Sequence, residues 1–266
     1  MSVPLECVIN LSEGRKTSLI DAIAAVAGPA LLDRHTDAVH DRTVLTLAGG
    51  GEAIESSARA VAAEAVRRLD LRGHQGAHPR FGVVDVVPFV PLNGTTIDGA
   101  VGARDRFARW AGNELGLPCF LYGPERALPA VRKGAFLTLA PDTGPHDPHP
   151  TAGACAVGAR WPLVAYNLWL AEGDVTTASA IAARLRSEHI RALGFAVGPH
   201  GQVSCNLVAP EIVGPAEVYD AVAAQAMVAR AELVGLIPRA VLTRIPSGRW
   251  AELDLADDRT IESRLG

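Results

Sequence analysis

The hydrophobic residues of the first third of the chain form short apolar runs and longer helical stripes. Four runs have the length and β-branched character of strands: 5–9, 30–33, 43–48 and 83–90. Between residues 51 and 69, apolar side chains recur with the roughly 3.6-residue period of one buried helix face. A further helix is predicted from 16 to 27, because Gly28 and Pro29 end the pattern there. The resulting order is strand–helix–strand–strand–helix–strand.

The same order of elements recurs in the second half of the chain. Strands are predicted at 162–170, 192–197, 203–208 and 233–237. Helices are predicted at 175–186 and at 215–232, the second with a proline in its first turn. A helix at 96–114 and a strand at 118–122 are predicted to follow the first unit.

Residues 141–153, PDTGPHDPHPTAG, contain four prolines and two glycines and are expected to form an irregular loop. The two repeated units predict an α/β protein, in the form of an α+β sandwich of two ferredoxin-like βαββαβ subdomains. We place the subdomains at residues 1–157 and 158–266. Because the loop falls where the two halves meet, a ligand cleft is expected between them.

Composition and charge exclude some classes of protein. A formal net charge of −4 provides no excess of cations for a general nucleic-acid binder. The chain has no apolar run of about 18 residues and no secretion-signal pattern at its start, so no membrane partner is expected. The four cysteines lack any paired spacing, which predicts reduced thiols in a cytoplasmic protein. Exposed strand edges make a homodimer plausible.

Residues 74–91, HQGAHPRFGVVDVVPFVP, place two histidines in a glycine-containing loop just before the most apolar predicted strand. Pro79 biases His78 towards an extended conformation, and Arg80 adds a permanent cation. A histidine held in this way suits proton transfer near neutral pH, so His78 is a candidate general base and acid. The simpler alternative is a histidine that only forms hydrogen bonds at a strand entrance.

A metal site is a second alternative for these histidines. His74 and His78 are four residues apart, as in helical zinc sites, but the glycines and the proline around them disfavour a helix. Together with His35 and Asp37 they could form a metal-dependent amidine or amide hydrolase. The sequence has no HExxH or CxxC spacing, so no metal is expected.

Six segments form an ordered set: ECVINLSEGR (6–15), HQGAHPRFGVVDVVPFVP (74–91), LYG (121–123), LPAVRKG (128–134), APDTGPHDPHPTAGACAVGAR (140–160) and VAYNLWL (164–170). Together they resemble the glutamate formiminotransferase family, which also forms the first half of formiminotransferase-cyclodeaminase. The resemblance extends to about residue 240. It implies two α/β subdomains with folate bound between them, in agreement with the fold predicted from the hydrophobic pattern.

The resemblance also implies an activity, the transfer of a formimino group from N-formiminoglutamate to N5 of the co-substrate tetrahydrofolate. His78 matches the catalytic histidine of the family's HPR motif. The family's folate-contacting loop matches Gly144, Pro145, His146, Asp147, Pro148, His149, Pro150, Thr151, Ala152 and Gly153. Both substrates carry carboxylates, and arginine binds these with better donor geometry than lysine. The candidates in the matched segments are Arg42, Arg80 and Arg160.

Four further residues are candidate binding residues. His35, Asp37 and His40 are expected on the loop between the second and third strands, which also carries His and Asp in bacterial members of the family. Asn167 interrupts an apolar strand, and a polar side chain in such a position must find a partner. We therefore expect Asn167 to line the ligand cleft.

The sequence departs from the family pattern at three positions in the matched segments or the loop after the second predicted strand. Ala77 stands where the family has Glu before the HPR motif, and Asp41 stands where it has Asn. Ala152 replaces a common Trp in the folate loop. These differences leave open a folate-binding paralogue that uses a different donor or has no catalytic activity.

Overall fold

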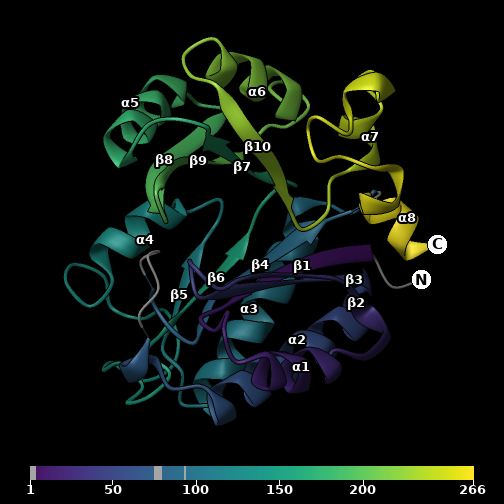
Figure 1. The fold of residues 1–266 in the computed structure, drawn as a ribbon. Coiled ribbons are helices and arrows are strands. Elements are labelled where there is room, and N and C mark those ends of the chain that lie inside the picture. Colours follow the sequence, from purple (N-terminus) through teal and green to yellow (C-terminus); the bar gives the residue numbers. More distant parts are fainter. Residues whose placement is uncertain (1–3, 75–79, 93) are drawn as a thin grey trace. The chain divides into compact units, whose positions relative to one another are not determined.

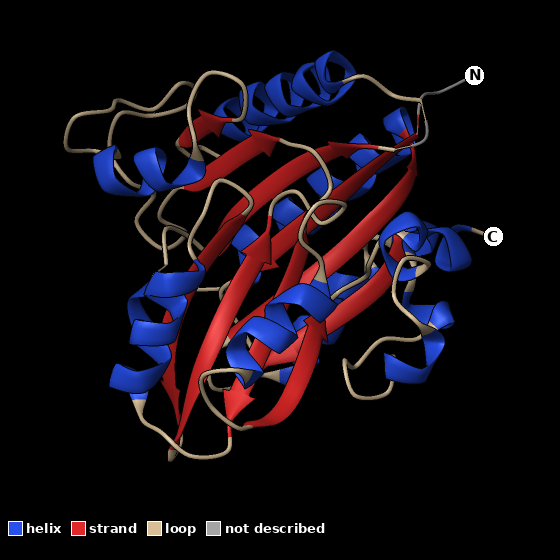
Figure 2. Cartoon of the chain, turned by 90° about the horizontal axis from the view of Figure 1, so that it is seen from above, coloured by secondary structure: helices blue, strands red, loops and turns tan. Residues whose placement is uncertain are grey.

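The computed structural model describes residues 4–74, 80–92 and 94–266, which form a mixture of helices and strands (Figure 1, Figure 2). The chain divides into two compact units, Met1–Trp161 and Pro162–Gly266. Each unit has its own sheet and its own hydrophobic core. The subdomain boundary expected at 157/158 lies shortly before this division, and as a boundary between functional subdomains it stays a prediction.

The first unit begins with the predicted order of strands and helices. Its elements are β1 (Pro4–Leu11), α1 (Thr17–Ala25), β2 (Leu31–Asp37), β3 (Arg42–Gly50), α2 (Gly51–Arg68) and β4 (Val84–Pro91). The four strands are antiparallel and lie in the order β2-β3-β1-β4, which is the ferredoxin-like arrangement. All residues of β4 are buried, as its continuous apolar sequence predicts.

Two parallel strands extend this sheet beyond β4. The added elements are α3 (Ile97–Glu114), β5 (Cys119–Tyr122), α4 (Leu128–Gly134) and β6 (Cys155–Ala159), and the sheet continues as β4-β6-β5. The sequence pattern predicts α3 and β5 but misses α4 and β6. The sequence of β6, CAVGA, has little β-branched character. A Cβ at Gly158 would lie 2.1 Å from the ring of Tyr122, so only glycine leaves room for this ring. The small residues of β6 are therefore explained by close packing and not by their intrinsic preference for a strand.

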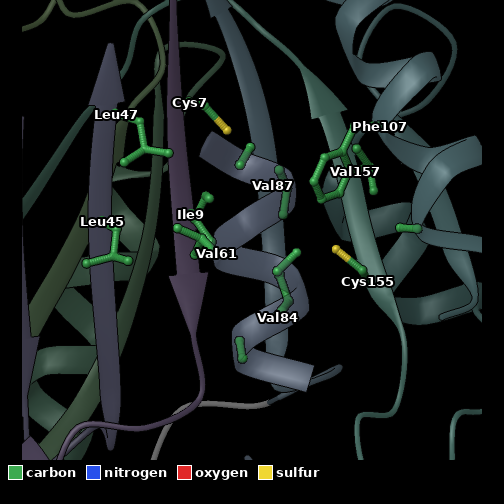
Figure 3. Packing of buried hydrophobic residues seen from close by; sticks show 14 of the residues in the cluster. Cys7, Ile9, Leu45, Leu47, Val61, Val84, Val87, Phe107, Cys155 and Val157 are labelled. Carbon is green, nitrogen blue, oxygen red and sulfur yellow. The ribbon is translucent and has the colours of Figure 1, made fainter. Parts of the chain in front are cut away.

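Helices α1, α2 and α3 cover one face of the six-stranded sheet, where the main core of the unit lies (Figure 1). Figure 3 shows part of this core, including Ile9 of β1, Leu47 of β3, Val61 of α2 and Phe107 of α3. A smaller cluster lies on the opposite face beside α4. There the ring of Phe120 packs edge-on against Phe81 and Phe136, at centroid distances of 5.3 and 5.0 Å.

The second unit is a four-stranded antiparallel sheet with α5 and α6 on one face (Figure 1). Its elements are β7 (Val164–Leu170), α5 (Val175–Leu185), β8 (Ile190–Val197), β9 (His200–Leu207), α6 (Pro215–Ala223), β10 (Val228–Val234), α7 (Arg239–Leu242) and α8 (Ile261–Leu265). The order β10-β7-β9-β8 is again ferredoxin-like, as predicted. Of the helices in the described ranges, none has the length and apolar character to cross a membrane.

The last predicted helix of the second unit is too long. It was expected to reach residue 232, but α6 ends at Ala223 and β10 begins at Val228. The alanine-rich sequence favours a helix locally. In the sheet, however, Ala231 packs into the core and the guanidinium of Arg230 lies 3.9 Å from the ring centroid of Trp169. Pairing with β7 therefore overrides the local helix propensity.

We expect Leu47→Ala to lower the free energy of unfolding by about 2–5 kcal/mol, because Leu47 is fully buried in the main core. Leu137→Ala is the matched control in the same unit. Leu137 is 82% exposed, so its loss should change the stability by less than about 0.5 kcal/mol. Urea denaturation followed by circular dichroism measures both variants, and equal losses would contradict this placement of the core.

Candidate active site

Segments from four parts of the chain meet at one end of the six-stranded sheet. They adjoin the end of β1, the β2–β3 turn and the starts of β4 and β6, and we call them the loop cluster: 12–16, 38–41, 71–74 with 80–83, and 149–154. The N–H of Ser12 donates to the carbonyl of Val83 at 2.9 Å, and that of Leu71 donates to the carbonyl of Thr151 at 2.8 Å. Residues far apart in the sequence are therefore fixed side by side.

Gly82 packs too closely against its neighbours for any side chain. An ideal Cβ at this position would lie 1.9 Å from the carbonyl oxygen of Ala154 and 2.7 Å from that of Ala152. The carbonyl of Gly82 in turn accepts a hydrogen bond from the hydroxyl of Ser12 at 2.7 Å. Glycine is thus required here by the close approach of three segments.

The proline-rich loop 141–153 contains no helix or regular strand, as predicted. Its end is a tight turn in which the backbones of His149 and Gly153 exchange hydrogen bonds of 2.8 and 2.9 Å. The Nδ1 atom of His149 accepts from the N–H of Ala152 at 3.0 Å, so this imidazole shapes the turn. Residues 144–148 precede the turn and are exposed.

Asp41, His74 and Arg80 form a chain of polar contacts in the loop cluster. Asp41 is 7% exposed; one carboxylate oxygen accepts from the N–H of Gly14 at 2.8 Å, and the other lies 3.2 Å from Nδ1 of His74. Nε of Arg80 donates to Nε2 of His74 at 3.1 Å, and its Nη2 donates to the carbonyls of His40 and Asp41. Burial lowers the pKa of His74, the charge of Arg80 lowers it further, and Asp41 opposes both.

Arg42 and Arg132 both lie close enough to Arg80 to affect its pKa. Burial lowers the pKa of Arg80 to about 10; Asp85 raises this pKa, and the other two arginines lower it. Arg80 is therefore still charged at neutral pH. Arg132 of α4 donates to the buried carboxylate of Asp85 at 2.6 Å. Sequence reasoning found Arg42 and Arg80 but missed this pair, although Asp85 is the one charged residue in β4.

His35 and Asp37 lie on β2 itself, which corrects the expectation that they belong to the following loop. The physical reason is the long ladder between β2 and β3, which pairs residues up to Asp37 opposite Arg42. One carboxylate oxygen of Asp37 accepts from the N–H groups of Val39 and His40, both at 2.8 Å. His40 does lie in the turn and is 2% exposed. Asp37 therefore acts in forming the turn.

Arg160 lies at the other end of the sheet of the first unit, and Asn167 lies in the second unit. Arg160 follows β6 at the strand end opposite to the cluster, and its Nη1 donates to the carbonyl of Trp161 at 3.0 Å. Asn167 belongs to β7 of the second unit and is 3% exposed. Its side-chain amide donates to the carboxylate of Glu232 at 2.9 Å, which is the kind of partner expected for a buried amide.

Residues 75–79, which include His78, lie outside the described residues, and His78 stays a prediction from the sequence. Their neighbours His74 and Arg80 belong to the loop cluster. In the part of the chain that the structure describes, no group of three or more His, Cys, Asp or Glu side chains could hold a metal ion.

Comparison with known proteins gives consistent matches. Residues 4–160 match the formiminotransferase domain, N-terminal subdomain. The glutamate formimidoyltransferase of Streptococcus pyogenes serotype M1 is 36% identical over 91% of both chains, and that of Thermoplasma acidophilum is 32% identical over 90% of this chain and 89% of its own. The formimidoyltransferase-cyclodeaminase of Sus scrofa is 35% identical over 90% of this chain but 51% of its own, so the chain spans about half of that relative.

The fold defines an α+β protein of two ferredoxin-like units, and the loop cluster of the first unit brings Asp41, His74 and Arg80 into contact. The family match makes this assignment specific: the chain belongs to the formiminotransferase family and is a transferase. The resemblance inferred from the six ordered sequence segments is thereby confirmed.

The cysteines provide a test of whether the protein has an accessible, reactive thiol. All four are buried, and burial raises the pKa of each thiol, to about 12 for Cys119 and Cys205. We expect almost no reaction of the native protein with a disulfide reagent such as dithiobis-nitrobenzoate at neutral pH, and reaction of all four thiols in guanidinium. Rapid labelling of a native thiol would contradict this burial and would identify a candidate nucleophile.

A second test concerns the packing at Gly82. Gly82→Ala should destabilise the protein by more than about 2 kcal/mol, because the new Cβ would collide with backbone carbonyls that cannot move independently. Gly73→Ala is the matched control, since nothing lies within 4 Å of a Cβ at that position. It should be neutral or stabilising by up to about 1 kcal/mol. Equal urea midpoints for the two variants would contradict the close approach.

Proposed function

We propose that the chain transfers a formimino group from N-formiminoglutamate to N5 of tetrahydrofolate, which serves as the co-substrate, without a metal ion. The observation that carries this proposal is the match to a free-standing glutamate formimidoyltransferase over 91% of both chains. The arginine-rich loop cluster supports it, because both substrates carry carboxylates.

The reaction is an amidine exchange through a tetrahedral adduct. N5 of the folate attacks the formimino carbon and loses its proton, and the glutamate nitrogen gains a proton as its bond to that carbon breaks. We assign both proton transfers to His78, since one imidazole can act first as base and then as acid. The buried thiols leave no activated cysteine for a covalent route.

We assign the carboxylates of the substrates to the arginines. Arg80 is the strongest candidate, because its Nη1 is a buried donor with no hydrogen-bond partner among the described residues. Arg42 lies close enough to Arg80 to add to the positive potential around its guanidinium. Loop residues 144–148 remain exposed and are proposed to contact the folate, whereas His149 holds the turn beside them.

Other sequence-based assignments stay predictions. Folate contacts by His35, Asp37, His40, Arg160, Asn167 and residues 149–153 belong to the proposal, and the ligand cleft expected from the sequence stays a prediction. The homodimer and the cytoplasmic location stay predictions as well.

The test is an assay of the purified chain with tetrahydrofolate and N-formiminoglutamate that follows 5-formiminotetrahydrofolate. We expect turnover by the parent and a reduction of kcat by about 10²–10⁴-fold in His78→Ala, because a positioned general base contributes a factor of this size. His200→Ala is the matched control, since His200 is exposed at the start of β9, and it should keep parental activity.

Each contrary result has a distinct meaning. A parent that binds tetrahydrofolate without turnover would favour a paralogue with a different donor or no catalysis. A parent that does not bind tetrahydrofolate would overturn the proposed function. A His78→Ala variant with parental kcat would overturn the role of this histidine while leaving the reaction in place.

A further inference from the structure

We propose that Asp41 and His74 form a positioning pair that holds Arg80 in the orientation needed to bind a substrate carboxylate. This proposal rests on the proposed function, in which Arg80 contacts the anionic substrate. Neither Asp41 nor His74 was among the candidate binding residues from the sequence. Both are assigned by the chain of contacts that runs from Gly14 to Arg80.

The first member of the pair is fixed by the backbone around it. Asp41 has a φ of +49°, a left-handed conformation that Asp tolerates better than most residues. A Cβ at Gly14 would lie 2.4 Å from the amide nitrogen of Arg42, so the two segments are in close contact. The N–H of Gly14 therefore reaches the carboxylate of Asp41 at 2.8 Å and sets its direction.

The contacts of His74 determine which of its nitrogens carries the proton. An arginine side chain can only donate, so Nε2 of His74, 3.1 Å from Nε of Arg80, must be the unprotonated acceptor. Nδ1 then carries the proton and faces the carboxylate of Asp41, with one carboxylate oxygen 3.2 Å from this nitrogen. Asp41 thus selects the one neutral tautomer of His74 that can hold Arg80.

The result is an arginine that is oriented but not neutralised. Nε of Arg80 is held by a neutral imidazole and Nη2 by the carbonyls of His40 and Asp41, so no carboxylate contacts the guanidinium among these bonds. The nearby carboxylate of Asp85 is hydrogen-bonded to Arg132. Two fixed nitrogens define the guanidinium plane, and Nη1 has no hydrogen-bond partner among the residues that the structure describes.

The charges around His74 decide when this arrangement fails. Burial, Arg80 and Arg15 lower the pKa of His74, whereas Asp41 and Glu13 raise it. Because the lowering effects dominate, His74 is neutral at pH 7. Protonation of His74 at acidic pH removes the acceptor for Arg80 and places two cations side by side, so the hold on Arg80 is lost only as the pH falls below the lowered pKa.

Two substitutions of His74 separate its two contacts. Gln places a terminal oxygen near the position of Nε2 and can still accept from Arg80, whereas Asn can replace only Nδ1 and its contact with Asp41. With the full chain we expect KM for N-formiminoglutamate to rise about tenfold in His74→Asn and in His74→Ala, but less than about threefold in His74→Gln. The kcat should change by less than about threefold in all three, since the chemical step is untouched.

A purely structural role would give a different result. Equal KM values for His74→Gln and His74→Asn, or a loss confined to kcat, would overturn the positioning role.

A second measurement does not depend on turnover. The ¹⁵N chemical shifts of His74 in the full chain report its tautomer and its titration. We expect the Nδ1–H tautomer at pH 7, a lower pKa of His74 in Asp41→Asn, and a higher one in Arg80→Met. The Nε2–H tautomer, or a titration that neither substitution moves, would overturn the pair. If the parent has no formiminotransferase activity, the proposed function fails while these spectra still decide the pairing.

Discussion

The carbonyl oxygens of Ala152 and Ala154 approach the backbone of Gly82 too closely for any side chain there, and the geometry of the loop cluster depends on this contact. It joins the turn before β6 to the segment before β4, and the hydroxyl of Ser12 adds the end of β1. Irregular backbone can be packed in this way only if its polar groups find partners. The hydrogen bonds among the three segments supply such partners, as between Ser12 and Val83 and between Val83 and Ala152.

The polar side chains in and beside the loop cluster divide into two kinds, although their sequence context is similar. Asp37 and His149 accept hydrogen bonds from nearby N–H groups and thereby shape turns. Arg80 instead has a buried donor, Nη1, with no hydrogen-bond partner among the described residues, and Arg42 lies close enough to affect the pKa of Arg80. A histidine or aspartate in a promising loop is therefore not by itself a ligand-binding residue, because short-range bonds to the backbone can occupy it fully.

Hydrophobic periodicity predicted most of the fold because α2, α3 and β4 have continuous patterns that tertiary contacts reinforce. It failed at β6 and at the start of β10, where small residues leave the period ambiguous and strand pairing decides. The site shows the same limit. Arg42 and Arg80 were named as candidates from sequence segments, whereas the contacts of Asp41 with Gly14 and His74 join residues 27 or more positions apart and carry no local signal.

In the proposed role of Arg80, a neutral imidazole between Asp41 and Arg80 resolves a conflict that binding sites for anions share. A carboxylate in direct contact would orient the guanidinium firmly, but it would also offset the charge that attracts the substrate. Backbone carbonyls and an unprotonated Nε2 provide direction with only partial charges. The carboxylate of Asp41 lies on the far side of His74 from Arg80, where its negative charge favours a proton on Nδ1 of His74. The orientation of Arg80 and the positive charge around it are thus controlled by different groups. This arrangement requires that His74 stay neutral at pH 7, and its lowered pKa meets that requirement.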